Sequence, residues 1–312
     1  MISLILAEKI FSLFLIMFMG YAVVHWGLLH AEDSKTLSLI SLYLISPCVI
    51  ISAFQVQYTP DVLHGLLLAL AAAVLLHVGI IVVVNLLGHA LHLDAVEKAS
   101  MIYSNSGNLL MPLIAATMGQ EWLFYTCAYM SALQLFVWTH GKSLICEEPQ
   151  VDFKKALCNL NIIAMVLGLL FFCARIRFPG VLGQAVESLG GALGSTSMLS
   201  IGISFATISH LDLKKMSRVL IVTVNRLIVY PLIMLAVFLL LRLNTLLPGA
   251  HEILMITLLG VGAPTGVVVT QIAQLYDKEA DHASLIGVFT MLCSILTLPA
   301  LIWVYESVTA LL

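Results

Sequence analysis

Apolar residues fill most of this chain in long runs, and short polar turns separate the runs. A run of about 20 apolar residues is what an α-helix needs to cross a bilayer. The pattern therefore predicts an all-α membrane protein with ten transmembrane helices. In order, the expected segments are residues 4–26, 37–54, 62–91, 95–118, 121–142, 156–174, 185–209, 216–243, 251–276 and 283–305.

The fourth and ninth segments carry glycine and proline inside apolar sequence. In the fourth, Gly107 lowers helix propensity and Pro112 lacks a backbone N–H, so we expect the helix to break between them. The ninth contains Pro264 within a glycine-rich stretch. Lipid cannot bond the freed backbone groups, and interrupted helices of this kind form the midplane substrate sites of secondary transporters.

A polar loop near the middle of the chain, residues 143–155, is the predicted boundary between two repeats. The first five-helix repeat would span residues 1–142 and the second residues 156–312. Repeats with an odd number of helices must insert with opposite orientations. The expected fold is thus two inverted five-helix repeats in which broken helices 4 and 9 cross.

The candidate site lies at this crossing. Half-helices that start after each break point their unpaired N–H groups toward the midplane, which favours an anion. The alternative is that the polar side chains only bridge helices. The expected substrate-binding residues are Asn105, Ser106, Gly107, Asn108, Pro112, Gly262, Pro264, Thr265, Gly266 and Gln271.

Two further residues are expected to support the site. Pro47 should kink or break the second segment. Arg226 lies about ten residues into the eighth segment, where a charge is costly and by default functional. Its guanidinium could pair with a substrate carboxylate, donate to the carbonyls of an opened helix, or snorkel to the membrane surface.

Several absences narrow the function. No Asp or Glu is placed deep in segments 2 to 10, since residues such as Glu97 stand near segment starts. Cation sites in membranes need acidic partners, so an anion carrier is favoured over a sodium/proton antiporter. No nucleophile with a matching base and no metal-ligand spacing is found, so neither an enzyme, a metal nor a cofactor is expected. His77 and His140 could shuttle protons, although each alone is typical of a packed polar residue.

Composition agrees with a membrane protein and excludes nucleic-acid partners. The chain is 61% hydrophobic and 10% charged, with a formal net charge of -3 and no basic run. Basic residues are concentrated in one set of loops, which the positive-inside rule places in the cytoplasm. Both termini are then extracellular and the protein lies in the cell membrane. The residues concerned are Lys35, Lys98, Lys142, Lys154, Lys155, Lys214, Lys215, Arg218 and Lys278.

These motifs resemble the auxin efflux carrier family, which includes plant PIN exporters and bacterial malate and malonate permeases. The closest match is P-T-G-V-V-V-T-Q-I-A-Q-L-Y-D, from Pro264 to Asp277. The resemblance implies an architecture like that of sodium/proton antiporters and bile-acid transporters, with a scaffold and a transport domain that moves as an elevator. The chain departs from the family pattern at Leu110, where many relatives carry glycine, and in the seventh segment, which lacks a proline.

The leading interpretation is a secondary active transporter of a small organic anion, a carboxylate or an auxin-like acid. A sodium/proton antiporter of related fold and a membrane-embedded ligand sensor are the alternatives. The expected partners are the organic acid and the lipid bilayer. The coupling ion, either proton or sodium, and the assembly state, with a homodimer as one option, stay open.

Overall fold

The computed structural model describes residues 2–30, 32–147, 158–206 and 216–310, which form helices joined by turns. Within these ranges there is no β-strand, and one isolated antiparallel bridge pairs Ser104 with Thr265. The described part is therefore all-α, as the sequence predicts.

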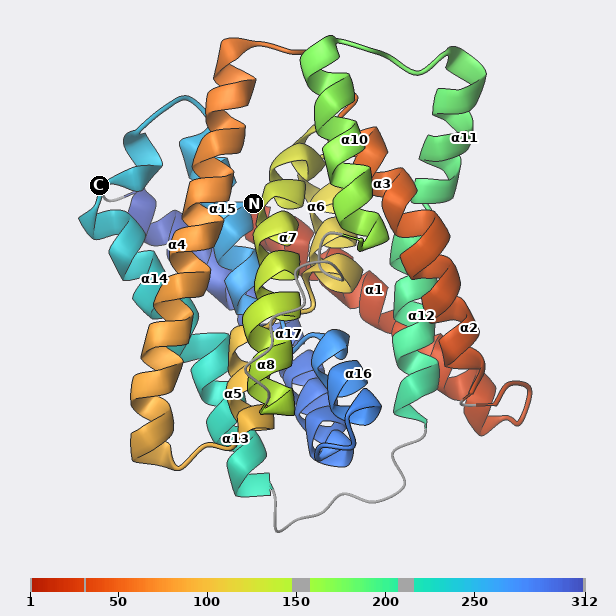
Figure 1. The fold of residues 1–312 in the computed structure, drawn as a ribbon, viewed down its shortest axis with the longest axis vertical. Helices are drawn as coiled ribbons and strands as arrows, with labels where there is room; N and C mark the ends of the chain where they lie inside the picture. The colour runs from red at the N-terminus through yellow and green to blue at the C-terminus, as the bar shows by residue number, and fades with distance from the viewer. Residues whose placement is uncertain (1, 31, 148–157, 207–215, 311–312) are drawn as a thin grey trace. The chain divides into compact units, whose positions relative to one another are not determined.

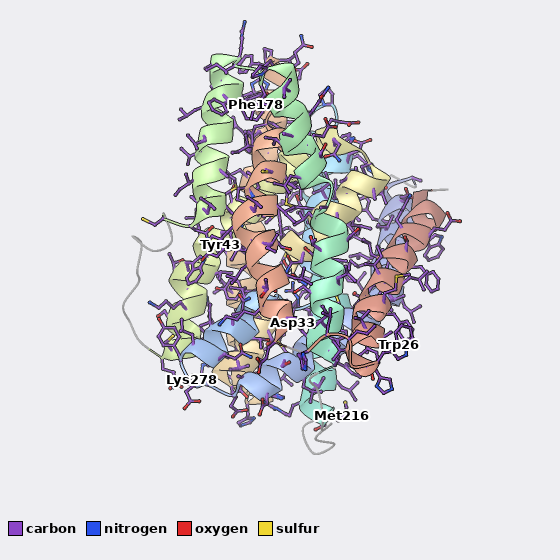
Figure 2. All side chains as sticks on the ribbon, turned by 90° about the vertical axis from the view of Figure 1, so that its right-hand side faces the viewer. Trp26, Asp33, Tyr43, Phe178, Met216 and Lys278 are labelled. Carbon is purple, nitrogen blue, oxygen red and sulfur yellow. The ribbon has the colours of Figure 1, made fainter. Side chains whose placement is uncertain are left out.

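Five helical runs among the described residues are long and apolar enough to cross a bilayer. Large exposed side chains lie on or next to them, such as Tyr43 in η1, which is 59% exposed, and Trp26 in the turn after α1, which is 71% exposed (Figure 2). Exposed apolar side chains of this kind are compatible with contact to lipid tails. The runs are α1 (Ile2–His25), α2 (Asp33–Ile40) with η1 (Ser41–Ile45) and α3 (Ser46–Ala53), α4 (Pro60–Leu91), α13 (Met216–Val224) with η5 (Asn225–Val229) and α14 (Tyr230–Leu240), and α17 (Ala280–Thr309).

Shorter helices complete the described part, and η marks π-helical or 3₁₀ turns. They are α5 (Ala95–Ile102), η2 (Ser106–Leu110), α6 (Met111–Thr117), η3 (Gln120–Trp122), α7 (Leu123–Phe136), η4 (Val137–Gly141), α8 (Lys142–Cys146), α10 (Leu160–Ala174), α11 (Gly180–Gly190), α12 (Leu193–Phe205), η6 (Leu243–Thr245), α15 (Ala250–Gly262) and α16 (Val267–Leu275).

The helices gather into two compact units, each built from both halves of the chain. The first unit comprises Met1–Leu63, Gly107–Cys127 and Leu157–His210. The second comprises His64–Ser106, Ala128–Ala156 and Leu211–Leu312.

In the first unit, α1 and α12 pack backbone against backbone because glycines face the contact. A Cβ atom on Gly202 would lie 1.9 Å from the carbonyl oxygen of Met17, and one on Gly20 would lie 2.5 Å from that of Leu199. Small residues of this kind let membrane helices approach closely. In the same unit, α3 packs on both α10 and α11 (Figure 1).

In the second unit, α17 is the central helix. It contacts α5, α13, α14, α15 and α16 (Figure 1). Its inward face is buried along most of its length and carries hydroxyls at Thr290 and Ser294 that are fully buried. Each hydroxyl donates to a carbonyl of the preceding turn, so neither is left unpaired.

Three prolines stand two residues after a π-helical turn: Pro47 after η1, Pro112 after η2 and Pro231 after η5. A helical proline donates no hydrogen bond and clashes with the carbonyl four residues earlier. In all three cases that carbonyl belongs to the π turn, whose wider hydrogen-bond ring leaves room for the proline. The helix continues through each proline.

This local geometry corrects three expectations. The fourth segment is interrupted at residues 103–105 rather than between Gly107 and Pro112. The run α2, η1, α3 is continuous, so Pro47 does not break it. The seventh segment starts at Gly180 and consists of two helices, because Gly190 and Gly191 weaken the helix before α12. Residues 148–155, which are the C-terminal part of the expected linker, lie outside the described residues.

Candidate functional site

Two extended stretches of the second unit, residues 103–105 and 263–266, lie side by side, and we call them the paired segments. The N–H of Asn105 donates to the carbonyl of Pro264 at 2.8 Å, and the N–H of Gly266 donates to the carbonyl of Tyr103 at 2.9 Å. The first stretch follows α5 and the second joins α15 to α16. Each interruption therefore satisfies part of the backbone of the other.

Local sequence explains why the second stretch is extended. Pro264 cannot donate to a preceding helical carbonyl, and it restricts Ala263, which adopts φ -66° and ψ 151°. Gly266 is then required by close approach, because a Cβ atom there would lie 2.9 Å from the carbonyl oxygen of Ser104. In the first stretch, Tyr103 is extended without a glycine or proline of its own.

Arg226 lies in η5, and its side chain is 1% exposed. Its Nε donates to the carbonyl of Ala263 at 3.0 Å, and its Nη1 donates to those of Met101 at 2.6 Å and Ile102 at 3.2 Å. These carbonyls stand where α15 and α5 end, where helices leave carbonyls unpaired and carry partial negative charge. Three roles were considered for Arg226. This geometry supports the one in which its guanidinium donates hydrogen bonds to the carbonyls of interrupted helices.

Most hydroxyls of the paired segments are engaged inside the protein. Thr265 donates through Oγ1 to the carbonyl of Ser100 at 2.9 Å, and its N–H donates to Oγ1 of Thr290 at 3.1 Å. Oγ of Ser104 lies 2.6 Å from that of Ser106 and 3.2 Å from Oη of Tyr129. These groups brace the paired segments and leave little capacity for a ligand.

Asn105 is the exception. The residue is 6% exposed, and its amide makes no hydrogen bond with another described residue. Its amide atoms are not among the fully enclosed polar atoms that lack a partner, so they keep access to the surroundings. The amide both donates and accepts, so it can bind a carboxylate or a hydroxyl that comes from outside the chain.

The remaining expected site residues are spread over both units. Gly262 ends α15 against Leu301, and Gln271 is exposed on α16. Gly107, Asn108 and Pro112 belong to the first unit, as does Pro47; there Oδ1 of Asn108 accepts from Ser197 at 3.3 Å and Pro112 lies against Gly194.

Two tyrosines at the candidate site were not among the residues predicted from the sequence. The ring of Tyr129 lies against Gly260, and that of Tyr103 lies against Gly141; a Cβ atom on these glycines would come within 2.6 Å and 2.7 Å of the rings. Glycines within apolar helices were a usable signal for such close packing. The pairing itself joins residues far apart in sequence, so local patterns could not reveal it.

The two embedded histidines contact these tyrosines. Nδ1 of His77 lies 2.7 Å from the carbonyl of Ala73, and the ring packs against Tyr129. Nδ1 of His140 lies 2.7 Å from Oη of Tyr103. Both thus have the packed positions that their sequence context favoured.

A family model described as a membrane transport protein matches residues 5–156 and again residues 145–302, which together cover nearly the whole chain. No curated protein matches the chain in a sequence search.

Proposed function

Because the chain belongs to the membrane transport protein family that includes the auxin efflux carriers, we propose that it is a secondary transporter of a small organic anion, with its site at the paired segments. The observation that carries this proposal is the Asn105 amide, which lies in the paired segments, is 6% exposed and makes no hydrogen bond with another described residue, while the hydroxyls of Ser104 and Thr265 beside it are bonded.

Electrostatics at the paired segments favours an anion. α16 begins directly after Gly266, and no side chain caps its N-terminus. An uncapped N-terminus offers backbone N–H groups and a partial positive charge. The guanidinium of Arg226 adds a full positive charge beside the same stretch, at Ala263. A carboxylate bound by Asn105 would be attracted by both.

The two compact units support an elevator mechanism. The second unit contains the paired segments and Arg226, and these are fastened to one another by hydrogen bonds within that unit. We propose that this unit carries the anion as one body while the first unit serves as scaffold. In this proposal α5 with α6, and α15 with α16, are the halves of interrupted fourth and ninth spans in two inverted five-helix repeats.

Flux measurements test the function. Purified protein in proteoliposomes is loaded with unlabelled malate, malonate or indole-3-acetate, and counterflow of the same labelled acid is followed. We expect counterflow of at least one acid by the wild type. Binding without counterflow would instead indicate a sensor, and sodium-dependent proton release without acid flux would indicate an antiporter.

The site is tested with Asn105→Ala. Removing a hydrogen bond to a charged ligand costs about 1.5–3 kcal/mol, so the affinity for the transported acid should fall roughly tenfold to hundredfold. Asn85→Ala is the matched control, because Asn85 is exposed on α4 of the same unit. If both variants transport as the wild type does, the anion does not bind at Asn105.

A further inference from the structure

A cavity of the first unit lies where two apolar helices end, and its volume is about 180 Å³. One wall comes from residues in the stretch 54–58, directly after α3, and the other from residues in the stretch 171–177, at the end of α10. The span that ends in α3 begins at Asp33. Figure 2 shows Asp33 and Phe178, which follows the second stretch, at opposite ends of this span. The cavity therefore lies at a membrane surface.

The two walls are fastened to each other. The N–H of Phe178 donates to Oε1 of Gln55 at 2.9 Å, and Nη1 of Arg177 donates to the backbone carbonyl of Gln55. The ring of Phe54 packs so closely on α10 that a Cβ atom on Gly168 would lie 2.6 Å from it. The cavity is thus built by two connected stretches of the chain that are far apart in sequence.

Aromatic rings and a guanidinium group line the cavity together. The guanidinium carbon of Arg175 lies 5.1 Å from the centroid of the Tyr58 ring, over its face. Tyr58 packs in turn against Phe172, with 5.2 Å between the ring centroids. A cation over an aromatic face is attracted by the ring, so this contact fixes the place of the positive charge.

The positive charges of the cavity are not neutralised within the described part of the chain. Neither Arg175 nor Arg177 forms an ion pair with a described residue, and of their side-chain N–H groups only Nη1 of Arg177 has a described hydrogen-bond partner. The nearest acidic residues along the chain, Asp61 and Glu187, are exposed and pair with neither arginine. Several N–H donors are therefore available to an anion from outside the chain.

Arg175 also has an unfavourable backbone conformation. It adopts φ 57° and ψ 30°, and its N–H closes the end of α10 by donating to the carbonyl of Phe172. Helices that end in this way usually have glycine at the left-handed position, because a Cβ atom is disfavoured there. The hydrogen bond needs no side chain. A bulky cation thus stands where glycine would be the more stable choice.

Two simpler explanations exist for these arginines. The positive-inside rule does not account for them, since neither belongs to the set of loops that it assigns to the cytoplasm. The other explanation is that both cations only complement the C-terminal dipole of α10. That explanation predicts that no bound molecule depends on the arginines, which separates it from a binding site.

We propose that this cavity binds the phosphate group of an anionic membrane phospholipid. The planar guanidinium groups of Arg175 and Arg177 match the paired oxygens of a phosphate. Apolar side chains continue from the cavity along the outer face of α10, where Ile176 is 52% and Leu170 is 58% exposed. They suit the acyl chains of a lipid, which a free phosphate ion lacks. A phospholipid also holds its phosphate at the membrane surface, where the cavity lies.

The site is tested on purified full-length protein in detergent. Phosphatidylglycerol, phosphatidylcholine or inorganic phosphate is added at equal concentration, and the midpoint of thermal unfolding is measured. Phosphatidylglycerol should raise the wild-type midpoint by a few degrees, because a ligand stabilises the folded state that binds it. Phosphatidylcholine should have a smaller effect, since its choline cation is repelled by the arginines. Inorganic phosphate should leave the midpoint unchanged.

Arg175→Gly is the main variant. It removes one guanidinium and relieves the left-handed backbone, so the lipid-free protein should be at least as stable as the wild type while the effect of phosphatidylglycerol is lost. Arg242→Gly is the matched control. Arg242 is exposed, is likewise left-handed at φ 49° after α14, and does not line this cavity. This control should respond to phosphatidylglycerol as the wild type does.

Arg177→Lys decides the question if Arg175→Gly is poorly folded. It keeps the charge but loses the planar set of donors, so the phosphatidylglycerol concentration needed for half of the stabilisation should rise roughly tenfold. An equal response of the wild type and the Arg175 and Arg177 variants to phosphatidylglycerol overturns the proposal. If inorganic phosphate stabilises the wild type as strongly as the lipid does, the ligand is a free anion and the lipid assignment is wrong.

Discussion

At the residue scale, Arg226 solves a problem that an interrupted membrane helix creates. The carbonyls of Met101, Ile102 and Ala263 belong to helix ends that are buried in the second unit, and Arg226 donates to all three. A buried unpaired carbonyl is costly, and a planar guanidinium can serve several acceptors at once. The charge is therefore spread over helix ends that carry partial negative charge, which lowers its own cost of burial.

This role predicts the behaviour of two variants. Arg226→Lys keeps the positive charge but loses the planar guanidinium with its several N–H donors, and Arg226→Gln loses both. Each buried carbonyl left unpaired costs about 1–3 kcal/mol. Both variants should unfold at lower temperature than the wild type before any ligand is added, and Arg226→Gln should be the less stable of the two.

The matched control is Arg242→Gln, because Arg242 is exposed in the turn before η6. Its midpoint of thermal unfolding should stay close to that of the wild type. If the Arg226 variants keep the wild-type midpoint but lose affinity for the transported acid, Arg226 binds the anion directly and the anchoring role is wrong.

Single residues also show where sequence reasoning stops. The depth and charge of Arg226 were sufficient to propose a donor to opened backbone, because few partners are available inside a membrane. The burial of Glu97 could not be predicted in this way. Its partners Arg218 and His282 lie more than 100 residues further along the chain, at 121 and 185 positions. In the structure Glu97 also forms a capping box with Asp94, a local contact that does not by itself imply burial.

At the element scale, hydropathy predicted the long spans well, since α4 and α17 begin and end within a few residues of the expected segments. It did not predict the interruption at residues 103–105. Nothing in Tyr103, Ser104 or Asn105 forbids a helix, and the extended backbone is stabilised by its pairing with residues 263–266. The breaks predicted at Pro47 and Pro112 are not found, because a π-helical turn before each proline accommodates its ring and the helix continues.

The packing of α1 on α12 gives a prediction at this scale. A Cβ atom at Gly202 would lie 1.9 Å from the carbonyl oxygen of Met17, so Gly202→Ala must push the two helices apart. Overpacking of this kind costs about 1–3 kcal/mol. The midpoint of thermal unfolding of purified Gly202→Ala should therefore fall below that of the wild type.

Gly183→Ala serves as control within the same unit. Gly183 is inside α11, and a Cβ atom there would make only an ordinary contact with Phe178 at 3.7 Å. Alanine has the higher helix propensity, so this variant should be as stable as the wild type or more stable by up to about 1 kcal/mol. Equal stability of both alanine variants would show that α1 and α12 are not in close contact.

At the scale of the whole molecule, the grouping of helices could not come from hydropathy. A hydropathy profile divides a chain at its polar loops, whereas each compact unit takes segments from both halves. The chain passes between the units inside α4, at the start of η2 and inside α7, among other places. These passages are where a movement of one unit against the other would have to be absorbed.

The orientation of the molecule in the membrane can also be tested. The excess of Lys and Arg in one set of loops predicts that residues 143–155 face the cytoplasm and that both termini are extracellular. The turn before α11 would then be extracellular. Val181, which is 84% exposed in the first turn of α11, is a suitable position for a label.

Cysteine labelling in intact cells decides this orientation. The exposed native cysteines Cys158 and Cys173 are first changed to serine, and Val181→Cys or Pro149→Cys is then introduced. Pro149 lies outside the described residues but within the predicted cytoplasmic loop. A membrane-impermeant maleimide should modify Val181→Cys from outside and leave Pro149→Cys unmodified until the cells are permeabilised. The reverse pattern would place both termini in the cytoplasm.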